Sequence, residues 1–107
     1  MTPSLPTPVD TLLKAANKNE SGAFLDSFAA DGVVDDWGRE FRGRSAIQGW
    51  SDKEFIGVRV SLEVTDVTEQ GGAWTVTAIV GGDGFNGPSH FTFEVDGSLV
   101  KRMTIRE

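Results

Sequence analysis

The sequence predicts an α+β fold in which helices come first and an antiparallel sheet follows. Before Val58 the apolar residues recur with the 3.6-residue period of a helix, and after it with the two-residue period of a strand. Strand-like segments joined by short turns then indicate an antiparallel meander. Such a sheet needs one face covered, so we expect three N-terminal helices to close a strongly curved sheet into a cone with a central cavity.

The first helix has clear start signals. Thr7 is a suitable N-cap, Pro8 suits the first helical position, and Asp10 completes a capping box. One face of this helix then carries an apolar stripe, which consists of Val9, Leu12, Leu13 and Ala16. The sequence therefore predicts an amphipathic helix that packs on the sheet.

The next segment predicts two further helices with two short strands between them. Residues 20–30 are expected to form the second helix. Residues 32–38 and 39–41 read as extended pieces that turn at Gly38, and Gly43 is expected to begin the third helix.

Four strands are predicted in the second half of the chain. Alternating segments separated by glycine-containing turns occur at residues 58–65, 74–80, 90–95 and 99–106. The dipeptide Asp96-Gly97 is a strong signal for a two-residue hairpin between the last two strands.

The amino-acid composition argues against several classes of function. The 107 residues fit a single domain over residues 1–107, with residues 1–6 expected to be a disordered tail. The net charge of −6 argues against nucleic-acid binding, and the short apolar runs argue against a membrane span. With no cysteine and one histidine, we expect no metal and no cofactor. The absence of cysteine and of a signal-peptide pattern favours a cytoplasmic location.

The segment from residue 28 to residue 47 carries a resemblance. It reads FAADGVVDD, then, after Trp37, GREFRGRSAI, and it is similar to the nuclear transport factor two-like superfamily. That superfamily includes ketosteroid isomerases, polyketide cyclases and dehydratases. The later strand pattern, as far as Ile105, fits as well, so the resemblance implies the cone fold for nearly the whole chain. It implies no single activity, because this fold hosts many functions.

The isomerases of that superfamily combine an aspartate base with an oxyanion hole made of a tyrosine and a protonated aspartate. The resemblance places the base at Asp36. It places the other two groups near Leu12 and Ser89, and this chain contains no tyrosine. The resemblance therefore implies a base position without the isomerases' oxyanion hole.

Asp35 and Asp36 are neighbours on a predicted strand, so their side chains should point to opposite faces. Only one of them can face the cavity, and the resemblance selects Asp36. Burial among aromatic side chains would raise the pKa of this carboxyl group and suit it to act as a general base or a polar anchor. The alternative is an exposed acid that is paired with Arg39 or Arg44.

The aromatic residues suggest an apolar ligand site, although each of them could equally be an ordinary core residue. The side chains expected to line the cavity and contact the ligand are Phe28, Trp37, Trp50, Phe55, Ser89, Phe91 and Met103.

The outer face of the sheet is expected to be weakly charged. By strand alternation it should carry Thr75, Thr77, Ile79, His90 and Thr92. A face of this kind can pack against a copy of itself, so we expect a homodimer formed through the outer sheet face.

Together these patterns favour a protein that binds a small, largely apolar molecule. Whether it also performs proton transfer, as isomerases and cyclases do, stays open. The alternative is a non-enzymatic homodimeric binding or protein-interaction module. A third interpretation is a structural domain whose cavity is filled by its own side chains.

Overall fold

The computed structural model describes residues 5–106 and has the α+β fold that the sequence predicts. The helices are α1 (Thr7–Asn17), α2 (Ser21–Asp26) and α3 (Arg44–Glu54), and a short 3-10 helix η1 (Ile56–Val58) follows them. The strands are β1 (Phe28–Asp36), β2 (Arg39–Arg42), β3 (Ser61–Gln70), β4 (Ala73–Gly81), β5 (Gly87–Asp96) and β6 (Leu99–Arg106).

The six strands form one sheet in the order β2-β1-β6-β5-β4-β3. Strands β3 to β6 are the predicted antiparallel meander, but β1 lies parallel to β6, with Val34 opposite Met103. The predicted antiparallel sheet is therefore joined by one parallel pair, which the sequence did not predict. Parallel neighbours need a long crossover connection, and here α3 and the strands between β1 and β6 supply it.

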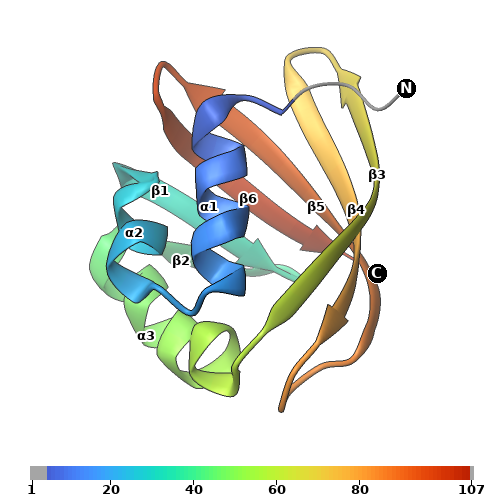
Figure 1. The fold of residues 1–107 in the computed structure, drawn as a ribbon. Coiled ribbons are helices and arrows are strands. Elements are labelled where there is room, and N and C mark those ends of the chain that lie inside the picture. Colours follow the sequence, from blue (N-terminus) through green and yellow to red (C-terminus); the bar gives the residue numbers. More distant parts are fainter. Residues whose placement is uncertain (1–4, 107) are drawn as a thin grey trace.

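The sheet is curved, and the helices lie on one of its faces (Figure 1). Register shifts in the β1·β6, β3·β4 and β5·β6 pairs mark the irregularities that let strands bend. The core lies between helices and sheet. Its fully buried aromatic side chains are Phe24, Phe28, Phe91 and Phe93.

The second helix is shorter than the sequence indicates. It ends at Asp26, and β1 already begins at Phe28, so residues 28–30 are strand rather than helix. Two contacts explain the difference. The backbone oxygen of Ser27 accepts a hydrogen bond from the Val100 amide (2.8 Å), and Phe28 pairs with Val100 in the sheet. Pairing with a strand far away in the sequence outweighs local helix propensity here.

The first helix begins at Thr7, but not with the expected cap. Pro6 occupies the cap position and no side chain caps the helix. Asp10 instead forms an ion pair with Lys14, one turn later (2.9 Å). Of the expected tail, residues 1–4 lie outside the described residues, and Leu5 packs against the core.

Candidate functional site

A pocket of about 340 Å³ opens at one end of the sheet, where β1 and β6 end and β5 begins. Helix α3 and the loop between β4 and β5 lie at this same end (Figure 1). The volume is at the lower end of the range usual for small-molecule sites. The pocket is lined by Asp36, Trp37, Trp50, Lys53, Glu54, Phe55, Val58, Val60, Val80, Gly81, Gly84, Phe85, Ser89, Phe91 and Ile105.

Five of the seven side chains expected at the ligand line this pocket, namely Trp37, Trp50, Phe55, Ser89 and Phe91. Phe28 and Met103 do not line it, because both are fully buried in the core. Phe28 packs edge-to-face on Phe24, with ring centroids 5.3 Å apart. Met103 lies mid-sheet, between its β-sheet partners Val34 and Phe93.

The structure places Asp36 toward the pocket and Asp35 on the opposite face, as strand alternation requires. One carboxylate oxygen of Asp36, Oδ2, accepts hydrogen bonds from the Trp50 indole nitrogen (3.0 Å) and from Arg39 Nη2 (2.6 Å). The Asp36 side chain is 16% exposed. Asp36 therefore lines the pocket and is also paired with an arginine.

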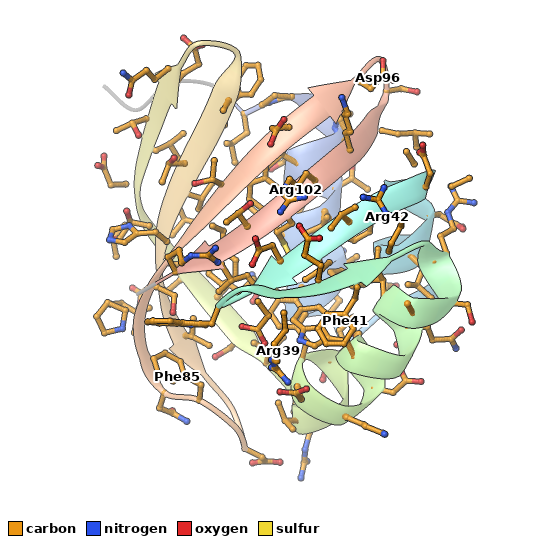
Figure 2. The ribbon with its side chains drawn as sticks, turned by 180° about the vertical axis from the view of Figure 1, so that it is seen from behind. Arg39, Phe41, Arg42, Phe85, Asp96 and Arg102 are labelled. Carbon is orange, nitrogen blue, oxygen red and sulfur yellow. The ribbon has the colours of Figure 1, made fainter. Side chains whose placement is uncertain are left out.

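Arg39 joins two carboxylates at the pocket edge. Besides Asp36, its guanidinium group donates two hydrogen bonds to Glu54 at the end of α3, at 2.7 and 3.1 Å. It also lies over the ring of Phe41, 5.6 Å from the centroid, and Figure 2 shows these two side chains close together. The hydrogen bonds from Arg39 hold the pKa of Glu54 below its usual range. The pairing with Glu54, and then with Asp36, raises the pKa of Arg39.

The inner wall of the pocket is built from packed aromatic rings. Trp50 and Phe55 are stacked, with centroids 4.9 Å apart and ring planes 22° apart. Phe55 in turn contacts Phe91, at 6.4 Å. Ser89, which is 4% exposed, adds a hydroxyl group to this otherwise apolar wall. The pocket is therefore apolar with few polar groups, which is the usual composition of a ligand site.

The role of Asp35 was not predicted from the sequence. On the outer face its carboxylate accepts hydrogen bonds from Arg102 (2.9 Å), from Arg106 (3.0 and 3.2 Å) and from the Gly38 amide (2.7 Å). The hydrogen bonds from Arg106 lower its pKa most, to about 2. Figure 2 shows Arg102 on this face of the sheet. A signal was present, because Arg102 and Arg106 share one face of a predicted strand.

In the part of the chain that the structure describes, no three acidic, histidine or cysteine side chains come together as metal ligands. Within residues 5–106, no helix has the length and apolar character needed to cross a membrane.

The sequence matches no protein-family model, and it matches none of the curated proteins. Solved structures do match. A candidate polyketide cyclase from Sinorhizobium meliloti is 27% identical, with a TM-score of 0.82 and 95% of each chain covered. A protein of ketosteroid isomerase-like fold from Catenulispora acidiphila, in complex with trimethylamine, is 24% identical, with a TM-score of 0.79 over 97% of this chain and 87% of that one.

A third structure is a Mycobacterium tuberculosis protein in complex with estradiol-17beta-hemisuccinate. It is 14% identical, with a TM-score of 0.77 over 94% of this chain and 90% of that one. These likenesses define the class of protein by its fold. The chain has the fold of the nuclear transport factor two-like superfamily, which confirms the resemblance stated from its sequence.

Proposed function

We propose that the pocket is the open end of a cone-shaped fold and binds a small, largely apolar molecule that donates a hydrogen bond to Asp36. The observation that carries the proposal is one inward carboxylate set in an aromatic and aliphatic wall. The three structures compared above support it, because two of them hold a small molecule. Since both have low identity to this chain, their ligands support the binding of a small molecule and not its identity.

The charges at the site favour a neutral ligand. A carboxylate that is ion-paired with Arg39 accepts hydrogen bonds and does not donate them, so a hydroxyl group suits Asp36 better than a carbonyl group. The four charged residues of this region, Asp36, Glu54, Arg39 and Lys53, sum to no net charge. An alcohol or phenol therefore fits the pocket better than a strongly charged molecule.

Binding is the function proposed, ahead of proton transfer. A proton-transfer reaction of the isomerase or cyclase kind would use Asp36 as its base. One of its oxygens already accepts two hydrogen bonds. The tyrosine that serves the isomerases is also missing, since the chain contains none. Ligand binding requires only the Asp36 carboxylate and the apolar wall of the pocket.

Replacing Asp36 with asparagine is expected to weaken binding of 2-naphthol, a neutral hydroxylated probe, about fivefold, because a charged acceptor becomes a neutral one. Stability should change little, since an asparagine oxygen can still accept from Trp50. Isothermal titration calorimetry measures the affinity and a thermal melt measures the stability.

Asp10→Asn is the matched control, because Asp10 is an ion-paired aspartate on α1, far from the pocket lining. Its affinity for 2-naphthol should equal that of the native protein. The proposal is wrong if the native protein does not bind the probe at millimolar concentration, or if the two variants bind it equally well.

The alternative, a homodimeric module, is favoured by the outer sheet face. Ile79 is 43% exposed there. Beside it Thr75 bonds Thr92 (3.0 Å) and Thr77 bonds His90 (2.9 Å), so hydroxyl groups and the imidazole ring satisfy one another across the strands. We propose that two copies pair through the part of this face that β4 and β5 form, beside the charged cluster of Asp35, Arg102 and Arg106, which is compatible with ligand binding in each copy.

Light scattering at roughly 50 µM is expected to give the mass of a dimer, and Ile79→Lys is expected to give a monomer, because it buries an unpaired charge in the interface. Val64→Lys serves as the control, since Val64 is equally exposed but lies on β3, at the edge of the sheet. A monomeric native protein would remove the dimer proposal without affecting the pocket.

A further inference from the structure

We propose that Trp37 and Phe85 form an aromatic clamp at the pocket mouth that selects ligands with a flat ring system. This inference rests on the proposed binding function and adds to it the shape of the ligand. The proposed function requires only an apolar molecule with a hydroxyl group, whereas the clamp requires a planar one.

The first observation is that the side chains of Trp37 and Phe85 are exposed to solvent. Among the described residues, the large hydrophobic side chains that are exposed are Trp37 (56%), Phe85 (53%), Val64 and Ile79. The two aromatic ones both line the same pocket, and the two aliphatic ones line none of its wall. Since large aromatic rings usually find cover, two uncovered rings at one opening indicate a surface meant to be covered by a ligand.

The second observation is the position of Trp37 and Phe85 relative to the strands of the sheet. Trp37 follows β1 and Phe85 follows β4, and in the sheet β6 and β5 lie between these two strands. Ile105 of β6 and Ser89 of β5 also line the pocket. The two rings are therefore carried by segments on opposite sides of β5 and β6. Figure 2 shows Phe85 on the β4–β5 loop, well apart from Arg39 and Phe41.

The third observation is the backbone at Trp37. Its φ of 55° lies in the left-handed region, which a bulky residue rarely adopts. Neighbouring bonds hold it there: its amide donates to the Ile105 oxygen (3.3 Å), and the next amide, of Gly38, donates to Asp35 (2.7 Å). A glycine would occupy this turn without strain. A strained tryptophan at a pocket mouth points to a function for its ring.

The loop that carries Phe85 is also held in place. The Asn86 side-chain amide donates to the backbone oxygens of Gly82 and Gly84, each at 3.0 Å. Gly84 lies against Val58 of η1 so closely that a Cβ there would be 2.9 Å from the valine methyl group. Both sides of the clamp are therefore positioned before a ligand arrives, which lowers the entropy lost on binding.

Two aromatic rings at one opening favour a planar ring, because stacking needs a flat partner. A saturated ring of the same size is puckered and loses most of that contact, although it buries similar apolar area. The ligand class that we infer is a neutral molecule with a flat, fused or conjugated ring system and a hydroxyl group.

The test compares 2-naphthol with its saturated counterpart, decahydro-2-naphthol, by calorimetry on the full chain. The native protein is expected to bind the flat alcohol about tenfold more tightly. Trp37→Gly and Phe85→Ala should each weaken 2-naphthol about fivefold and leave the saturated alcohol within about twofold. Trp37→Phe, which keeps a ring at this position, should retain most of the affinity.

Two controls separate the clamp from general effects. Ile79→Ala removes an exposed apolar side chain away from the pocket and should change neither affinity. Trp37→Gly should melt no lower than the native protein, because the left-handed backbone suits glycine, so its loss of affinity would not reflect unfolding.

The outcomes distinguish this inference from the proposed function. If both alcohols bind but the clamp variants weaken them equally, or weaken neither, the clamp is wrong and the pocket stands. If neither alcohol binds the native protein, the proposed function is wrong and the clamp falls with it.

Discussion

Asp35→Ala is expected to destabilise the protein by roughly 2–3 kcal/mol, the usual range for hydrogen bonds to a charged group that is almost buried. Asp35 is only 7% exposed, and its two oxygens accept from Arg102, from Arg106 and from the Gly38 amide. The substitution leaves these donors without their acceptor. Arg102 keeps a second partner, Glu40 (2.6 Å), which limits the loss.

Urea unfolding at pH 7 measures this difference in free energy. Asp31→Ala is the matched control, because Asp31 is an exposed aspartate on the same strand. It should change stability by less than about 0.5 kcal/mol. Equal effects of the two substitutions would contradict the role given to Asp35.

The same carboxyl group predicts a pH dependence. Its pKa is lowered from 3.8 to about 2 in the folded protein, so the unfolded chain binds its proton more readily. The stabilisation is therefore complete above the unfolded value, and it is lost as the pH falls from about 4 through about 2. The difference in unfolding free energy between the native protein and Asp35→Ala should shrink over that interval. A constant difference would show that the carboxylate charge does not contribute.

Arg39→Met is expected to change the charge preference of the pocket. It leaves Asp36 and Glu54 without the cation that both contact, so the pocket becomes negative. A cationic probe, 2-naphthylmethylamine, should then bind about tenfold more tightly than to the native protein, and added salt should weaken the gain. The neutral probe 2-naphthol should change little. Calorimetry at two salt concentrations measures both effects.

Arg59→Met is the control for this change. Arg59 is also paired with an aspartate, Asp83 (3.1 Å), but neither residue lines the pocket. Its affinity for the amine should therefore stay at the native value. If Arg39→Met also leaves the amine affinity unchanged, the ion pair with Asp36 does not set the charge of the site.

Periodicity alone predicts much of the architecture. The change of period at Val58 locates the meander, and strand alternation assigns Asp35 and Asp36 to opposite faces of the sheet. Both follow from local geometry, since neighbouring side chains of a strand must point apart. What local geometry cannot supply is pairing between distant segments. The boundary between α2 and β1 and the parallel neighbour of β1 both depend on β6, far along the chain.

The candidate site shows the same contrast between residues that local sequence predicts and residues whose position depends on the pairing of distant segments. Trp50 and Phe55 were assigned to the pocket as aromatic residues, and both line it, Trp50 from α3 and Phe55 from the position directly after this helix. Phe28 and Met103 belong to the same residue classes, yet they lie in the core, because the register of the sheet decides which apolar side chain reaches its open end. Of the two partners of Asp36, the hydrogen bond from Trp50 was not predicted. An ion pair with Arg39 was expected only for an exposed Asp36. The turn at Trp37–Gly38 instead lets Asp36 face the pocket and pair with Arg39.

The parallel pairing of β1 with β6 also bears on how the molecule folds. Asp35 and Arg106 are 71 positions apart in the chain. Strand β1 can therefore pair with β6 only after a long loop has closed. Closing long loops is slow, because their entropy is lost before any contact repays it. We therefore expect the β3–β6 meander, with its short turns, to form early. The pocket, which needs both Asp36 and Ile105, would be completed in the last step of folding.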